Sequence, residues 1–152
     1  MDKSEPNFLP PLRPTARAVI RRRSSLLVQV KAHLDKGRYF TLPGGRQEIG
    51  ETLQDCVRRE CEEEIGAEVD VGQLLHVAEV FKKKADGICH QIEVLFECTV
   101  ADGYEPRLGP HPDSSQVDTV WANLTKDASM FRPDYASVLL SRQPAYLGVY
   151  HV

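Results

Sequence analysis

The stretch Gly44–Ala67 reads GGRQEIGETLQDCVRRECEEEIGA and carries the strongest structural signals in this 152-residue chain. Thr52 is a suitable helix N-cap with Asp55 three residues later, and Gly66 stands where a helix often ends in a left-handed glycine. These signals predict a helix over Thr52 to Ile65, of ordinary length for a globular domain.

Side chains of the predicted helix follow one another at about 100° per residue. On that spacing an apolar stripe is formed by Leu53, Cys56, Val57 and Cys61. Glu60 and Glu64 fall inside the stripe, and Glu63 lies on its edge, whereas Glu62 points toward water. Three carboxylates are therefore expected together on the inward side of one helix.

Such an arrangement is electrostatically unfavourable without a cation. Carboxylates three or four residues apart on a helix repel each other, and they stand at the negative end of the helix dipole. A solvated acidic face is the usual explanation for a run of glutamates, but the overlap with the apolar stripe argues against it. Oxygen donors without a nearby histidine suit a hard ion, Mg²⁺ first and Mn²⁺ second.

The rest of the chain has the composition of one globular domain, with 41% hydrophobic and 27% charged residues. A net charge of −3 argues against sequence-independent nucleic-acid binding. No apolar stretch is long enough for a transmembrane helix, and residues 1–14 lack the apolar core of a signal peptide. The four cysteines include no CxxC pair, which favours reduced core thiols. We therefore expect a cytoplasmic protein with no membrane partner.

Apolar alternation and turn signals divide the chain further. We expect an extended segment over 1–14 and a single domain over 15–152, with strands at 15–22, 26–31, 39–42, 74–83, 88–100 and 117–124. Loops are expected at Pro43–Gly45 and over 101–116, and a terminal helix over 133–142. Many strands with one central and one terminal helix predict an α/β (α+β) fold with a mixed sheet between helices.

The spacing of glycines and charges in the opening stretch is similar to the Nudix box. That motif reads glycine-x5-glutamate-x7-arginine-glutamate-U-x-glutamate-glutamate-x-glycine-U, and here it runs from Gly45 through Glu51 and Arg59 to Ala67. All its fixed positions match. The two U positions, which usually hold bulky aliphatic residues, are Cys61 and Ala67.

The resemblance covers about residues 15–142 and implies a Nudix-like α/β/α sandwich with a mixed central sheet. It implies a pyrophosphohydrolase that depends on a divalent metal and cleaves a nucleoside diphosphate linked to another moiety. Nucleotide sugars, dinucleotides and nucleoside triphosphates all belong to that class. The implied metal ligands are Glu60, Glu63, Glu64 and the carbonyl of Gly44. Arg59 and Glu51 are implied to pair and to fix the catalytic loop and helix.

The sequence allows more than one general base, substrate and function. The general base is either Glu63 or a carboxylate outside the box, namely Glu97, Glu105 or Asp113, although Glu93 and Glu97 are expected to face solvent. Arg17, Phe81 and Asp113 are candidate substrate contacts. The sequence leaves the nucleotide undefined, and a homodimer is compatible with the resemblance. Alternatives are a non-catalytic Nudix-fold module that senses a nucleotide and, less favoured, a di-iron protein, which needs Glu-x-x-His motifs.

Overall fold

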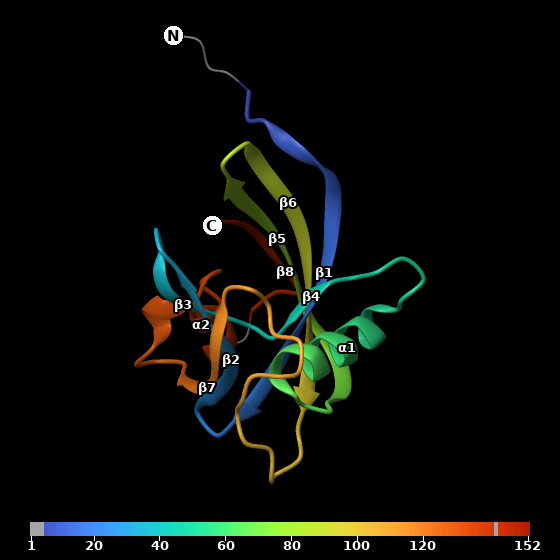
Figure 1. Ribbon diagram of the computed structural model, residues 1–152, viewed down its shortest axis with the longest axis vertical. Coiled ribbons are helices and arrows are strands. Elements are labelled where there is room, and N and C mark those ends of the chain that lie inside the picture. The colour runs from blue at the N-terminus through green and yellow to red at the C-terminus, as the bar shows by residue number, and fades with distance from the viewer. Residues whose placement is uncertain (1–4, 142) are drawn as a thin grey trace.

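The computed structural model describes residues 5–141 and 143–152, so residues 1–4 of the expected extended segment and Arg142 of the expected terminal helix lie outside it. Its strands are β1 (Phe8–Arg22), β2 (Ser25–His33), β3 (Gly37–Thr41), β4 (Gly44–Arg46), β5 (Asp70–Lys84), β6 (Gly87–Thr99), β7 (Gln116–Asn123) and β8 (Tyr146–His151). Its helices are α1 (Leu53–Ile65), α2 (Ala136–Leu140) and the 3₁₀ turn η1 (Ala128–Met130). Figure 1 shows this arrangement.

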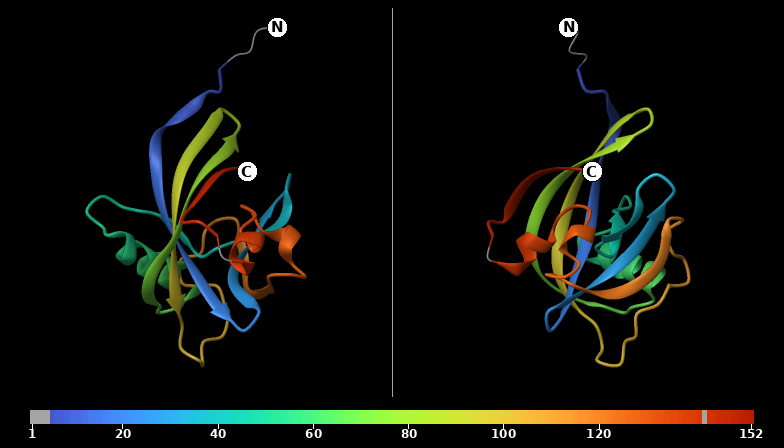
Figure 2. Two further views of the ribbon diagram at one scale, coloured as in Figure 1. Left: turned by 180° about the vertical axis from the view of Figure 1, so that it is seen from behind. Right: turned by 90° about the vertical axis from the view of Figure 1, so that its left-hand side faces the viewer.

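The strands form one mixed sheet in the order β3-β2-β1-β6-β5-β8, with β4 added to β1 and β7 added to β2. The β1–β6 and β5–β8 pairs are parallel, and the other pairs are antiparallel. The described β1–β2 pairing consists of Arg21↔Leu26 and Arg22↔Ser25. The sheet therefore has two parts, β4-β1-β6-β5-β8 and β7-β2-β3, which are joined at the end of β1 and separate from there (Figure 2).

Each face of the sheet is covered by its own apolar cluster. Helix α1 packs on one face, where Cys56, Val57 and Cys61 are fully buried against residues of β1 and β6. The other face carries η1 and α2, and the residues that flank them, Phe131 and Tyr135, belong to the second cluster. The expected mixed sheet between helices is confirmed, because burial of both sheet faces requires an element on each side.

The predicted central helix is confirmed together with its capping residues. The Thr52 hydroxyl accepts a hydrogen bond of 3.1 Å from the Asp55 backbone N–H. Gly66 ends the helix at φ 60°, ψ 29°, a left-handed conformation that glycine adopts at little cost. Glu62 is exposed and Glu64 is buried, as the helical spacing predicts.

The expected loop at Pro43–Gly45 is wrong in part. Gly44 to Arg46 form β4, which pairs with β1 through Gly44↔Arg17 and Gly45↔Ala16. A Cβ on Gly44 would lie 2.0 Å from the Ala16 carbonyl oxygen, so the two backbones approach too closely for any side chain there. Two glycines were therefore a sign of strand contact rather than of a free loop.

The chain ends also differ from expectation. Strand β1 begins at Phe8, so residues 8–14, expected as a lead-in, pair with β6 from Phe8↔Ile88 onward. The terminal helix is shorter than predicted and spans Ala136–Leu140, because Ser141 already has extended backbone angles. Strand β8 was not predicted, and it pairs in parallel with β5. Neither α1 nor α2, the α-helices of the described residues, has the length and apolarity needed to cross a bilayer.

Candidate active site

Arg59 of α1 and Glu51, in the segment before α1, form a bidentate ion pair. Arg59 Nε donates to Glu51 Oε2 over 2.6 Å, and Nη2 donates to Oε1 over 2.9 Å. Arg59 Nη2 also donates to the Arg46 carbonyl at 3.1 Å, which ties β4 to the helix. Hydrogen bonds from Arg59 lower the pKa of Glu51 to about 2, so this carboxylate stays ionised.

The same guanidinium reaches two glutamates of the helix itself. Arg59 Nη1 lies 2.9 Å from Glu60 Oε1 and 3.3 Å from Glu63 Oε2. Gly45 leaves the space that the Glu60 carboxylate occupies, because a Cβ at this position would lie 2.7 Å from Glu60 Cδ. The positive charge of Arg59 is therefore shared among carboxylates that would otherwise repel each other.

Glu64 is the most buried of the helix glutamates, with 8% of its surface exposed. Burial, the hydrogen bond with Glu60 and the charge of Glu60 raise the pKa of Glu64 to about 8. Arg17 and a hydrogen bond from the amide of Gln29 oppose this rise. Gln29 is itself fully buried on β2, a polar residue within an apolar strand.

The loop before β7 holds the end of helix α1 in place. The backbone N–H of His111 donates to the Glu63 carbonyl at 2.8 Å, and that of Gly109 donates to the Glu64 carbonyl at 2.9 Å. Gln116 Nε2 also donates to the Glu64 carbonyl, at 2.9 Å. These donors satisfy carbonyls that the helix end leaves unpaired, and they fix the backbone of two expected metal ligands.

The donor chemistry of Glu60 and Glu64 fits a hard divalent cation. Two carboxylates face each other, one of them buried with a raised pKa, which is the situation that a bound cation relieves. Within residues 5–141 and 143–152, no three acidic, histidine or cysteine side chains converge in metal-binding geometry. The Glu63 carboxylate accepts a hydrogen bond from Arg59 Nη1 at 3.3 Å. The Gly44 carbonyl accepts a hydrogen bond from Arg17 Nη1 at 2.9 Å.

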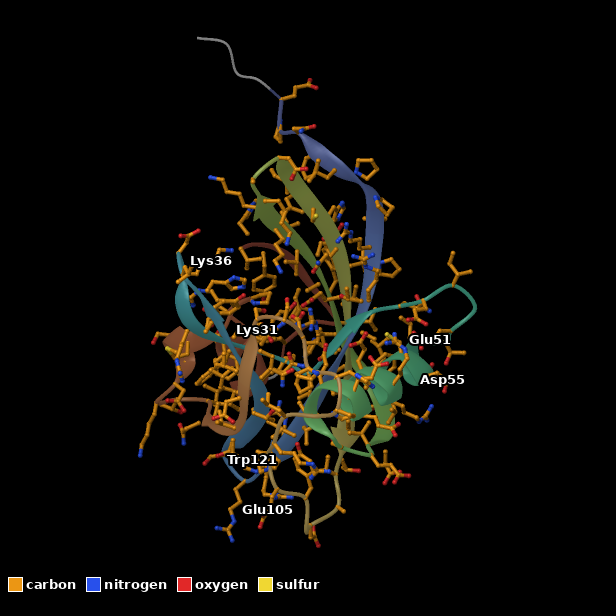
Figure 3. All side chains as sticks on the ribbon, viewed as in Figure 1. Lys31, Lys36, Glu51, Asp55, Glu105 and Trp121 are labelled. Atoms are coloured by element: carbon orange, nitrogen blue, oxygen red, sulfur yellow. The ribbon has the colours of Figure 1, made fainter. Side chains whose placement is uncertain are left out.

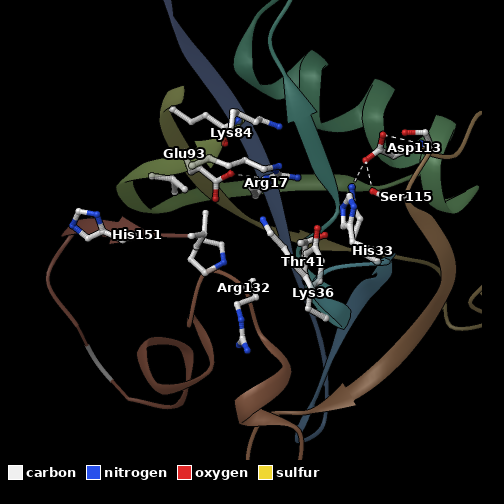
Figure 4. Close-up of a pocket in the computed structure, with 18 residues that line it drawn as sticks. Arg17, His33, Lys36, Thr41, Lys84, Glu93, Asp113, Ser115, Arg132 and His151 are labelled. Carbon is white, nitrogen blue, oxygen red and sulfur yellow. Dashed lines mark hydrogen bonds and ion pairs between the residues drawn. The ribbon is translucent and has the colours of Figure 1, made fainter. Parts of the chain in front are cut away.

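A cavity of about 640 Å³ lies between the two parts of the sheet (Figure 4). The box glutamates do not line it, but Arg17, which donates to the Gly44 carbonyl, does. Arg17 and Asp113, two of the expected substrate contacts, both line it. Phe81 does not line this cavity; its ring packs edge-on against Phe8 and His90, with centroid distances of 5.1 and 4.8 Å. The structure therefore brings Arg17 and Asp113 together and places Phe81 apart.

Glu93, expected to face solvent, is instead buried with 2% of its surface exposed. Its carboxylate accepts hydrogen bonds from Arg17 Nε at 2.9 Å and from the Tyr135 hydroxyl at 2.8 Å. Burial lowers the pKa of Arg17, but the charges of Glu93 and Glu64 outweigh burial and raise it. Glu93 thus fixes the arginine between the cavity and the helix, a role that strand alternation alone did not reveal.

The carboxylates considered as a general base outside the box lie in different surroundings. Asp113 forms an ion pair with Lys31, and although burial raises its pKa, the contacts with Lys31 lower it overall. Glu105 is exposed and lies at the far end of the molecule from Lys36 (Figure 3). Glu97 is exposed on β6, 3.4 Å from Gln73 Nε2. Asp113 is the one of these three that lines the cavity.

Comparison with known proteins identifies the family and supports the fold. Residues 11–140 match the family model described as the NUDIX domain. A NUDIX hydrolase from Nitrosomonas europaea has a similar structure, with a TM-score of 0.69, 19% identity and 86% coverage of each chain. A MutT NUDIX hydrolase from Burkholderia pseudomallei is 27% identical with a TM-score of 0.63, over 76% of this chain and 85% of that one.

A curated relative, putative nudix hydrolase 1 of Caenorhabditis elegans, is 30% identical over 99 residues. The alignment covers 65% of this chain and 24% of that relative, so the chain spans about a quarter of its length. Together the fold, the loop–helix–loop and the family match define a Nudix-domain protein. The chain belongs to the Nudix hydrolase family.

Proposed function

We propose that this protein hydrolyses a pyrophosphate bond, with the help of a divalent metal, in a nucleoside diphosphate linked to another moiety. The observation that carries the proposal is the buried carboxylate of Glu64, placed against Glu60 at the negative end of α1. A fold seldom retains two adjacent carboxylates there unless a cation joins them. Membership of the Nudix family supports the same reaction class.

Glu60 and Glu64 are the proposed first ligands of Mg²⁺, with Mn²⁺ as a substitute. Glu63 is proposed as a third ligand once its carboxylate leaves Arg59, and the Gly44 carbonyl as a fourth. When bound, the metal supplies charge neutralisation on the phosphate oxygens and an acidified water.

The residues of the chain have distinct proposed tasks around that centre. Arg59 and Glu51 fix β4 and α1 relative to each other, so that the box carboxylates stay in position. Glu63, the most exposed of the three ligands at 38% of its side chain, is the proposed group that orients or deprotonates the attacking water. Arg17, which faces the cavity, is proposed to hold a phosphate oxygen of the substrate.

A non-catalytic, nucleotide-sensing module is the second candidate. The same cavity beside the box could bind a nucleotide without cleaving it. Against this candidate, every charged position of the box is retained, and each of those side chains lies in the loop–helix–loop. Selection for binding alone would not require three adjacent carboxylates beside a phosphate site, because they repel an anionic ligand.

The test is a hydrolysis assay on a panel of nucleotide sugars, dinucleotides and nucleoside triphosphates. The protein is incubated with each compound in Mg²⁺, and the nucleotide products are separated by ion-exchange chromatography and measured. We expect metal-dependent release of a nucleotide product from at least one class, abolished by EDTA. Tight nucleotide binding with no release in Mg²⁺ or Mn²⁺ would favour the sensing module instead.

A further inference from the structure

Six lysine and arginine side chains line the cavity between the two parts of the sheet. Basic residues come from four separate regions of the chain, on both parts of the sheet: Arg17, Lys31, Lys36, Lys82, Lys84 and Arg132. Two carboxylates, Glu93 and Asp113, face the same space. Figure 4 shows Arg17, Lys36, Lys84 and Arg132 around it.

Those two carboxylates are already paired. Glu93 binds Arg17 over 2.9 Å, and Asp113 binds Lys31. The other four cations, Lys36, Lys82, Lys84 and Arg132, form no salt bridge with any other described residue. An excess of about four positive charges therefore faces one cavity.

The environment of Lys82 indicates that the excess of positive charge in the cavity destabilises the folded protein. The Lys82 side chain is partly buried on β5, and burial together with the nearby charges of Lys84 and Lys31 lowers its pKa to about 8. Like charges that are crowded in a partly desolvated cavity destabilise the fold unless an anion joins them. The arrangement is accounted for if its usual occupant is strongly negative.

Residues of β1 and β2 connect the lining of the cavity to the proposed metal site: Arg17 lines the cavity and donates to the Gly44 carbonyl at 2.9 Å. Alternate residues of β2 point to the same side: Gln29 donates to Glu64, Lys31 pairs with Asp113, and His33 stacks on Tyr39 with ring centroids 5.7 Å apart. This row leads from the box carboxylates to the cationic cavity. One ligand can therefore reach both.

We infer that the substrate carries phosphate groups beyond the scissile pyrophosphate, and that Lys82, Lys84 and their neighbours bind these distal phosphates. The inference rests on the proposed function and specifies its substrate class. A phosphate monoester carries up to two negative charges near neutral pH, so about two such groups would balance the four unpaired cations. An uncharged sugar in this position would leave those cations without a partner.

Direct binding tests this without relying on hydrolysis. Inorganic tripolyphosphate is titrated into the protein by calorimetry in the absence of divalent metal. Lys82→Met keeps most of the apolar stem, and Lys83→Met is the matched control, since Lys83 is the adjacent residue of β5 and does not line the cavity. We expect wild type and Lys83→Met to bind equally, and Lys82→Met to bind about tenfold more weakly.

A second arm uses catalysis with NAD⁺ and NADP⁺, which share the scissile linkage and differ by one phosphate. The inference expects a higher kcat/KM for NADP⁺ in wild type and a ratio near one in Lys82→Met/Lys84→Met. Tripolyphosphate affinity that is absent, or unchanged in Lys82→Met, overturns the inference even if hydrolysis is observed. Lysine-dependent binding without any hydrolysis would instead contradict the proposed function and leave the cavity assignment standing.

Discussion

Arg59 joins Glu51 through two hydrogen bonds, Nε to Oε2 at 2.6 Å and Nη2 to Oε1 at 2.9 Å, across eight positions of sequence. The Glu51 side chain is 13% exposed, so water screens the pair only weakly. The pair closes the segment between β4 and α1. The position of the box glutamates therefore depends on an interaction that involves no substrate.

Glu51→Gln should lower the free energy of unfolding at pH 7 by about 1–3 kcal/mol, because it removes a two-point charged contact. The folded pKa of Glu51 is depressed to about 2, so its contribution is complete above the ordinary glutamate pKa and is lost as pH falls toward 2. Urea denaturation at pH 7, 4 and 3 should show the difference from wild type shrinking. Glu48→Gln, at 3.9 Å from Arg59 with a 70% exposed side chain, is the control and should change little.

Arg17 and Glu93 should be strongly coupled. Either Glu93→Gln or Arg17→Met alone leaves a buried partner unpaired and should destabilise the fold by about 3 kcal/mol. The double variant should be more stable than the sum of the two losses predicts, with a coupling energy of about 1–3 kcal/mol. Urea denaturation of the four proteins measures this cycle. Strictly additive losses would show that the ion pair does not hold Arg17 in place.

Gly45→Ala should impair metal-dependent turnover more than stability. The new Cβ would lie 2.7 Å from the Glu60 carboxylate carbon, which is the mobile end of a side chain and can be displaced. We expect kcat in Mg²⁺ to fall at least about tenfold while Tm stays close to that of wild type. Gly103→Ala is the control, since no atom lies within 4 Å of a Cβ placed there. Equal turnover in both variants would mean that the Glu60 position is not critical.

Affinity for tripolyphosphate should decline as pH rises from 7 to 9. Burial and the charges of Lys84, Lys31, Arg17 and Lys36 lower the pKa of Lys82 to about 8, so the ammonium group loses its proton within this range. Lys82→Arg should flatten the profile, because arginine stays charged. Calorimetry without divalent metal gives both curves. His33 and His151 also face the cavity, but they are present in both wild type and Lys82→Arg, so they do not cause a difference between the two curves. Parallel curves would contradict a role for Lys82.

The central helix was predictable from sequence because its signals are local. Thr52, Asp55 and Gly66 define its ends through contacts within four or five residues, and the stripe of apolar side chains fixes its orientation. Strand β8 and residues 8–14 of β1 lack such signals. They are held by pairing with β5 and β6, which are distant in sequence. The strand propensity of a segment does not reveal such distant partners.

The candidate site was predictable to a similar extent. The glutamates of the box follow from spacing, whereas the roles of Glu93 and Gln29 follow from tertiary contacts. A polar residue within an apolar strand, as in Leu26–Val30, was a usable signal for Gln29. For the cationic cavity the basic run Lys82–Lys84 was a partial signal, but it could not show that Lys82 and Lys84 line the cavity and Lys83 does not. Its lysines and arginines come from β1, β2, the turn between β2 and β3, β5 and the segment after η1, and only folding brings them to one space.

We propose that Glu60, Glu63 and Glu64 form a catalytic metal site on or beside the inward side of α1. The most direct test compares kcat for Mg²⁺-dependent hydrolysis in Glu64→Gln and Glu62→Gln, two neighbouring and nearly identical substitutions. Glu64 is buried beside Glu60 and Glu62 is exposed, so Glu64→Gln should lower kcat about 10²-fold or more and Glu62→Gln should retain wild-type turnover. Full activity in Glu64→Gln, or an equal loss in both variants, would contradict the account.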